Sequence, residues 1–175
     1  MKIKILQVGE IQPNILDIIV DNLNKRFKNK FYFGGKIDIP EDSYDKFKNQ
    51  YNSGVVVKTL KNEKGEDDKV VGITSNDLYY KDLNFVFGLT EENVCIVSTA
   101  RLDPQFYGNS ANFELLINRT LKEVVHEVGH MFGLKHCTNP LCVMSFSSSI
   151  SYVDDKKDEF CKDCTLKISM EDIRI

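Results

Sequence analysis

The sequence lacks any apolar run of the roughly 20 residues that a bilayer-spanning helix needs. Residues 1–8 alternate polar and apolar side chains, so they lack the apolar stretch and small-residue cleavage site of a secretion signal. A basic stripe is missing too, because the formal net charge is −3 and Lys and Arg are interleaved with Asp and Glu. We therefore expect a cytoplasmic protein with no membrane partner and no nucleic-acid partner.

Internal repeats and low-complexity tracts are also absent, and 175 residues are enough for one domain with a substantial core. The charged run at residues 61–69 is the best candidate for a linker between domains. Neither flank is long enough to fold alone, so we interpret this run as a surface loop between strands. We predict a single domain over residues 1–175.

The apolar pattern predicts an α+β fold, because some segments alternate and others repeat every three or four residues. Strands are predicted at residues 2–8, 30–39, 54–60, 69–74, 85–89 and 94–99. Helices are predicted at residues 14–27 and 113–132, with a shorter one at 44–51. Residues 101–111 are rich in Gly, Pro, Asn and Ser and predict a loop, and the chain after 133 predicts mostly loop with one short helix.

Histidine is scarce, and all three histidines fall within residues 126–136. His126 and His130 lie four residues apart, which on a helix places them on one face about 6 Å apart and suits two ligands of one tetrahedral zinc. Gly133 can take the left-handed conformation that ends the helix, so that His136 returns as a third ligand. Packing or surface histidines would not concentrate in this way, and we interpret the three as the ligands of a catalytic zinc.

Glu127 follows the first of these histidines directly. At that place its carboxylate can reach the open coordination position of the metal. It can then take a proton from zinc-bound water as that water attacks a peptide carbonyl. The residue pattern therefore predicts a zinc-dependent peptidase with Glu127 as general base.

Cysteine is absent from most of the chain but clusters near its end. Cys95 stands alone in an apolar strand, where we expect a buried core residue, and the other four are Cys137, Cys142, Cys161 and Cys164. A reducing cytoplasm disfavours disulfides, and four thiolates form a closed tetrahedral zinc site with no room for water. We interpret these four as a structural zinc site. A redox C-x-x-C pair, disulfides outside the cell, and an iron–sulfur cluster are the alternatives.

The histidine motif matches the extended metzincin pattern, His126-Glu-x-x-His130-x-x-Gly133-x-x-His136. The residues that follow it make the chain resemble the archaemetzincin family: Cys137, then Cys142-x-Met144, then Cys161-x-x-Cys164. The resemblance implies a zincin-like single domain, in which a twisted mixed β-sheet packs against helices and its edge strand binds extended substrate. It also implies a zinc-stabilised C-terminal segment.

Within this resemblance, Met144 takes the place of the residue that forms a hydrophobic floor beneath the zinc. Some metzincins carry a tyrosine two residues after that methionine, where it stabilises the transition state. Phe146 occupies this position here, so no such role is assigned, and Glu127 must carry the proton transfer largely alone.

Three parts of the domain follow from these motifs. Residues 1–111 contribute the N-terminal sheet and helices, 112–136 the active-site helix and third ligand, and 137–175 the cysteine-rich zinc segment. We expect two zinc ions per chain, one catalytic and one structural, a peptide or protein substrate, and a monomer. The alternative is a non-catalytic, zinc-stabilised module that binds a protein or peptide. Glu127 favours the enzyme, because a purely structural three-histidine site needs no carboxylate there.

Overall fold

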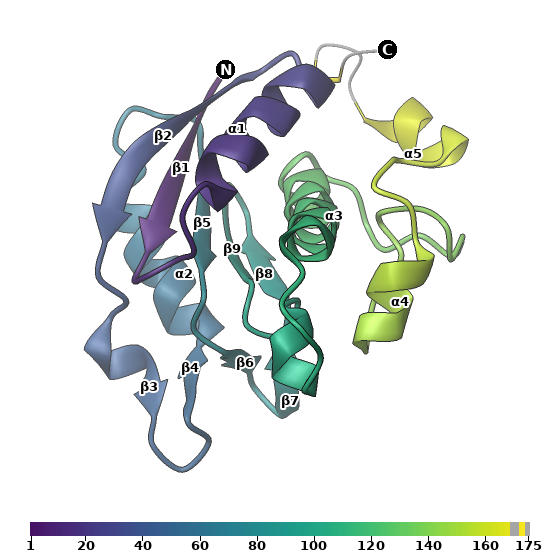
Figure 1. Ribbon diagram of the computed structural model, residues 1–175. Helices are drawn as coiled ribbons and strands as arrows, with labels where there is room; N and C mark the ends of the chain where they lie inside the picture. The colour runs from purple at the N-terminus through teal and green to yellow at the C-terminus, as the bar shows by residue number, and fades with distance from the viewer. Residues whose placement is uncertain (169–171, 174–175) are drawn as a thin grey trace.

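A five-stranded sheet forms the centre of the molecule, with strand order β2-β1-β5-β9-β8. The computed structural model describes residues 1–168 and 172–173 (Figure 1). The sheet consists of β1 (Lys2–Val8), β2 (Lys30–Ile37), β5 (Lys69–Thr74), β8 (Gly88–Glu91) and β9 (Val94–Ser98). Its strands run parallel except β8, which pairs antiparallel with β9 and forms one edge.

Helices cover both faces of this sheet (Figure 1). Helices α1 (Ile15–Arg26) and α3 (Phe113–Met131) pack on one face, and α2 (Ser53–Asn62) packs on the other. Successive residues of β9 therefore enter opposite cores: Cys95 and Val97 face α3, whereas Val94 and Ile96 face α2. Strands buried on both faces are apolar throughout, which explains the continuous apolar run at this strand. Cys95 is fully buried, as predicted.

A second, smaller sheet has the order β3-β4-β6-β7 and lies at the end of the large sheet (Figure 1). Its strands are β3 (Tyr44–Asp45), β4 (Gln50–Asn52), β6 (Leu78–Tyr80) and β7 (Leu83–Val86). Only Phe87 separates β7 from β8. Residues 83–91 thus form one continuous path from the small sheet to the edge of the large one.

The C-terminal segment covers the side of α3 that faces away from the sheet (Figure 1). It contains α4 (Ile150–Asp155) and α5 (Lys162–Lys167), and Ile173 bridges back to Phe27. Because it is covered from both sides, α3 buries even Arg119, Lys122 and Glu123. Within the described residues, no helix is both long and apolar enough to cross a membrane.

The expected α+β fold, with a mixed sheet packed against helices, is confirmed. The strands at 2–8, 30–39, 69–74 and 94–99 and the helices at 14–27 and 113–132 form within one or two residues of their predicted bounds. The expected strand at 85–89 is divided between β7 and β8, and the loop at 101–111 contains a 3₁₀ turn, η2 (Pro104–Tyr107). Two short helices, α4 and α5, take the place of the one expected after residue 133.

Two local predictions were wrong. Residues 54–60 form the helix α2 rather than a strand, although their three consecutive valines favour β-structure. The Asn52 side chain accepts hydrogen bonds from the amides of Gly54 and Val55 and so caps the helix, and Val56, Val57 and Leu60 bury one face against the sheet. The charged run at 61–69 therefore connects a helix to a strand.

The short helix predicted at 44–51 is the second error. These residues form the β3–β4 hairpin instead, preceded by a 3₁₀ turn, η1 (Glu41–Ser43). Asn49 takes a left-handed φ of 52° in the turn, a conformation that Asn tolerates better than most residues. Pairing of β4 with β6, which lies far along the chain, then stabilises the hairpin.

Candidate active site and metal clusters

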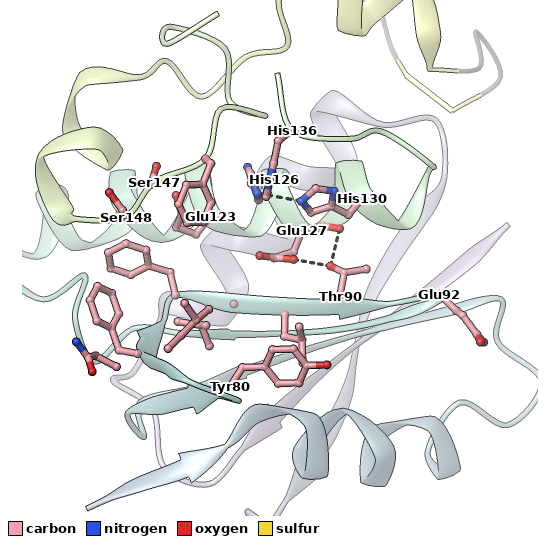
Figure 2. A pocket seen from close by; sticks show the side chains of 18 residues that line it. Tyr80, Thr90, Glu92, Glu123, His126, Glu127, His130, His136, Ser147 and Ser148 are labelled. Atoms are coloured by element: carbon pink, nitrogen blue, oxygen red, sulfur yellow. Dashed lines mark hydrogen bonds between the residues drawn. The ribbon is translucent and has the colours of Figure 1, made fainter. Parts of the chain in front are cut away.

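The three histidines converge on one point (Figure 2). Each offers one ring nitrogen, and these atoms lie within 4.8 Å of one another. The Nε2 atoms of His126 and His130 are 3.1 Å apart. Two imidazole ligands of a tetrahedral zinc have nitrogens roughly 3.3 Å apart, given Zn–N bonds of about 2.0–2.1 Å. The three rings therefore fit a single zinc ion.

Backbone carbonyls hold two of these rings in the orientation that a metal ligand needs. His126 Nδ1 donates to the carbonyl of Val143 at 2.8 Å, and His130 Nδ1 donates to that of Leu134 at 2.7 Å. Each ring then carries its proton on Nδ1 and turns the lone pair of Nε2 toward the common point. Burial lowers the pKa of His126 well below its usual range and lowers that of His130 and His136, which favours neutral imidazoles.

The end of α3 explains how His136 reaches the other two. Gly133 has a φ of +89°, and its amide donates to the His130 carbonyl at 2.9 Å. The Leu134 amide donates to the Gly129 carbonyl at 3.0 Å, which completes a Schellman turn. This turn reverses the chain and presents the Leu134 carbonyl to His130. Gly133 thus lets the chain bring His136 to the site, and it also positions the carbonyl that orients His130.

Glu127 lies against the edge strand β8, in the same cleft (Figure 2). The Thr90 hydroxyl donates to Glu127 Oε2 at 2.5 Å. Gly88 lies so close that a Cβ there would be 2.8 Å from Glu127 Oε1. Burial raises the pKa of Glu127 to about 8, and the Thr90 hydrogen bond opposes this shift. A cation held by the neighbouring histidines would oppose it further, because opposite charge favours the ionised carboxylate.

Met144 packs against α3 at Gly129. Its side chain is fully buried, and its sulfur would be only 2.4 Å from a Cβ placed on Gly129. Gly129, which lies between His126 and His130 in the sequence, therefore leaves the space that the Met144 side chain fills. Phe146 is 58% exposed, and its ring lies 5.2 Å from that of His136, at the mouth of the cleft.

The four clustered cysteines also converge, with sulfur atoms within 4.8 Å of one another. Cys137 and Cys161 have sulfurs 3.7 Å apart, close to the roughly 3.8 Å expected between two sulfur ligands of a tetrahedral zinc. The Cys142 sulfur accepts hydrogen bonds from the amides of Met144 at 3.4 Å and Cys161 at 3.3 Å. A backbone hydrogen bond with Cys164 lowers the pKa of Cys161 to about 7, whereas burial raises the pKa of Cys142 and of Cys164. This donor set fits a closed thiolate site.

One short segment contacts both clusters. Cys142 belongs to the cysteine group, and the next residue, Val143, supplies the carbonyl that orients His126. Met144 accepts a hydrogen bond from the Cys137 amide at 2.9 Å through its own carbonyl. Because Cys137 also follows His136 directly, the two clusters are linked through two separate stretches of backbone.

A cleft of about 560 Å³ opens beside the histidines (Figure 2). Residues 83–90 line it on the side of the sheets, and α3 lines the opposite side with Glu123, His126, Glu127 and His130. The other lining residues are Tyr80, Glu92, His136 and residues 146–148. The cleft is therefore largely apolar along the β7–β8 path and polar around the histidines.

Sequence reasoning missed several groups that position the site. Thr90 and Gly88 were not singled out, nor were the carbonyls of Val143 and Leu134. Backbone carbonyls carry no residue-specific signal, so a single sequence cannot reveal them. Thr90 and Gly88 become recognisable only when β8 is placed beside α3.

Comparisons with known proteins agree with this site. The sequence model described as Peptidase family M54 matches residues 2–170. The chain is 42% identical to the archaemetzincin of Methanocaldococcus jannaschii over 180 residues, which covers 100% of this chain and 97% of that relative. The archaemetzincin of Pyrococcus furiosus is 38% identical over 174 residues, covering 94% and 90%.

Solved structures give the same result. The crystal structure of archaemetzincin from Archaeoglobus fulgidus aligns with a TM-score of 0.85 at 35% identity, covering 96% of this chain and 100% of that one. A zinc-dependent peptidase from Methanocorpusculum labreanum aligns with a TM-score of 0.84 at 28% identity, covering 95% and 100%. The chain therefore belongs to Peptidase family M54, the archaemetzincins, and is a zinc metallopeptidase with a zincin-like fold.

Proposed function

We propose that His126, His130 and His136 hold the catalytic zinc and that Glu127 is the general base in peptide-bond hydrolysis. The observation that carries this proposal is the convergence of three imidazole nitrogens within 4.8 Å, beside a buried carboxyl group that faces the same cleft. When bound there, zinc supplies Lewis-acid chemistry, which makes water more nucleophilic at neutral pH and polarises the peptide carbonyl.

Glu127 performs the proton transfers. Its carboxylate accepts the proton of the attacking water and later delivers it to the nitrogen of the leaving amine. Thr90 binds Oε2, which fixes the plane of the carboxylate and leaves Oε1 as the oxygen that accepts the proton. Gly88 has no side chain to displace that oxygen.

The edge strand β8 is suited to bind the main chain of the substrate. Of the described strands, it pairs with β9 alone, so its other edge has backbone N–H and C=O groups available for pairing. An extended peptide can add itself to such an edge as a further strand. This pairing would place a peptide bond in the cleft between β8 and the histidines.

The cysteine cluster supports a second, structural zinc held by Cys137, Cys142, Cys161 and Cys164, which makes two ions per chain. A site closed by four thiolates stabilises the fold around it and leaves no position for water. A monomeric state, a cytoplasmic location and the absence of nucleic-acid and membrane partners stay predictions from the sequence.

Cleavage of a mixed peptide library by native protein and by Glu127→Gln tests the general base. We expect Glu127→Gln to lose about 10²–10⁴-fold in rate, because its amide cannot accept the proton, while the zinc content stays equal. The matched control is Glu92→Gln, an exposed carboxylate that lines the same cleft and is expected to retain cleavage. No cleavage by native protein with a filled histidine site would favour the non-catalytic binding module instead.

A further inference from the structure

A buried ion pair joins α3 to the segment that follows α4. The Lys156 ammonium lies 2.9 Å from Glu123 Oε1, and the two side chains are 0% and 5% exposed respectively. The same ammonium donates a hydrogen bond to the Ser145 carbonyl at 3.3 Å. Burial raises the pKa of Glu123, and Lys156 opposes this shift, so the lysine stabilises the ionised carboxylate inside the protein.

A buried pair of this kind contributes little to folding. The cost of removing two charges from water largely offsets their attraction, and apolar residues of similar volume often serve stability equally well or better. Hydrogen-bonded charges do, however, fix the distance and direction of the groups that they join, whereas apolar contacts can slide. The role of the pair between Glu123 and Lys156 must therefore be sought in what it holds in place.

Lys156 begins a segment that is hydrogen-bonded to residues 141–145. Two backbone bonds join the two stretches: the Lys157 amide donates to the Leu141 carbonyl at 2.9 Å, and the Val143 amide donates to the Glu159 carbonyl at 3.0 Å. Together with the bond from Lys156 to the Ser145 carbonyl, they make residues 141–145 and 156–159 one unit.

This unit contacts α3 at three points. The contacts are those of Glu123 with Lys156, of His126 with the Val143 carbonyl, and of Gly129 with the Met144 side chain. Residues that are three apart on a helix are neighbours on its surface, so the three contacts follow one another along α3. The ion pair comes about one turn before the hydrogen bond of His126 and fixes where the unit sits along the helix.

We propose that Glu123 and Lys156 are positioning residues of the histidine site: their ion pair holds residues 141–145 against α3, so that the Val143 carbonyl keeps His126 in the orientation that binds zinc. This inference rests on the proposed function, because it takes His126 as a zinc ligand. Groups that orient a metal-binding histidine typically contribute about 10–100-fold to metal affinity. Neither Glu123 nor Lys156 takes part in the proton transfers.

Replacement of the whole ion pair separates its orienting role from folding. Glu123→Leu together with Lys156→Met fills nearly the same volume without charge, so we expect its urea unfolding midpoint in excess zinc to stay close to that of native protein. Chelator competition should show zinc at the histidines bound roughly tenfold more weakly. In the zinc-loaded variant, the four clustered cysteines should resist a thiol reagent as they do in native protein. Added zinc should restore cleavage, since Glu127 is unchanged.

A second variant and a control complete the test. In Lys156→Met alone, Glu123 can take up a proton, so this variant should also fold and show the weaker zinc binding. Lys69→Met removes another buried lysine, which lies on β5 and donates to Asn93, and should keep the native zinc affinity.

Three results would overturn the positioning role. They are native zinc affinity at the histidines in both variants of the pair, cysteines that react more readily than in native protein, and failure of both variants to fold in excess zinc. In the last case the pair is a requirement of the fold alone. Weaker zinc binding by the variants of a native protein that cleaves no peptide supports the positioning role and contradicts the peptidase function. Cleavage with unchanged zinc affinity in both variants does the reverse.

Discussion

At the residue scale, small contacts decide how the reactive groups of the site are held. Thr90 binds the carboxylate of Glu127, and Gly88 and Gly129 leave space for Glu127 and Met144 respectively. None of these three is a candidate metal ligand or general base. Each acts by allowing or enforcing one position of a neighbouring group, so its replacement should change activity or stability through that neighbour.

Thr90→Val tests the hydrogen bond to Glu127. Valine has nearly the shape of threonine but no hydroxyl, so the carboxylate loses its orienting donor. We expect kcat to fall roughly tenfold at unchanged zinc content, the loss of about 1.4 kcal/mol. Thr90→Ser retains the hydroxyl and should keep most of the activity. Equal kcat values for the Val and Ser variants would contradict the role of the hydroxyl.

Gly129→Ala tests the contact between α3 and Met144. Alanine in a helix interior usually stabilises a protein by about 0.5–1 kcal/mol relative to glycine. Here the added methyl collides with the Met144 sulfur, so we expect the free energy of unfolding to fall by about 1–3 kcal/mol in urea titrations. Adding Met144→Val should recover part of the loss. A more stable Gly129→Ala protein would show that the floor of the site adapts freely.

At the element scale, charged side chains of α3 hold α4 in place. Arg119 donates two hydrogen bonds to the Asp154 carboxylate, at 2.7 and 2.8 Å, and a third to the Leu102 carbonyl. Lys122 donates to the carbonyls of Val153 and Asp154 at the end of α4. Because residues 146–148 lead directly into α4, this anchoring also holds the outer wall of the cleft.

Asp154→Asn weakens that anchor. Asp154 is partly exposed, so solvent screens the ion pair, and we expect a loss of only about 1 kcal/mol in the free energy of unfolding. The larger effect should be on KM, which rises several-fold as the cleft wall loosens, while kcat changes less. Asp155→Asn is the control, since Asp155 is exposed and forms no ion pair with any described residue. A fall in kcat alone would mean that Asp154 affects the chemical step rather than the cleft wall.

Helix α2 is an element at which local sequence rules fail. Three consecutive valines at 55–57 favour a strand, yet they form part of α2. The Asn52 cap and burial against the sheet outweigh β-propensity, whose contribution depends strongly on context. The helix α3 was predictable over its full length because its apolar stripe is long and regular.

At the scale of the whole molecule, the histidine and cysteine clusters are linked through the backbone. His136 and Cys137 are adjacent, and the segment from Cys142 to Met144 reaches both clusters. Loss of one metal should therefore loosen the ligands of the other. A structural metal site contributes directly to folding free energy, so this coupling acts on stability and on zinc affinity together.

Replacement of Cys161 and Cys164 by Ser tests the coupling. We expect zinc to fall from two ions per chain to less than one, because His136 and the Val143 carbonyl lose their fixed positions. Elemental analysis measures the zinc content per chain, and chelator competition measures the zinc affinity. Cys95→Ala removes a thiol outside the cluster and should keep both ions. One remaining ion with unchanged affinity at the histidines would show that the two sites are independent.

The sequence alone determined the sets of candidate ligands, the helix that carries two of them and the glycine that ends it. Two histidines four residues apart on a helix share one face, and a glycine that ends the helix lets the third return, so these local features already imply a shared point. The family resemblance followed from the same short segment. The apolar strands of the large sheet were also predictable, because burial on both faces leaves a continuous apolar run.

Only the tertiary structure decided what surrounds those ligands. Thr90 lies 37 residues from Glu127 in sequence, and the Val143 carbonyl lies 17 residues from His126. Glu123 and Lys156 come from opposite sides of the metal-binding motif in the sequence and form one buried ion pair. Such contacts depend on how the edge strand, α3 and the C-terminal segment pack together, and packing over long sequence separations leaves no periodic signal in the chain.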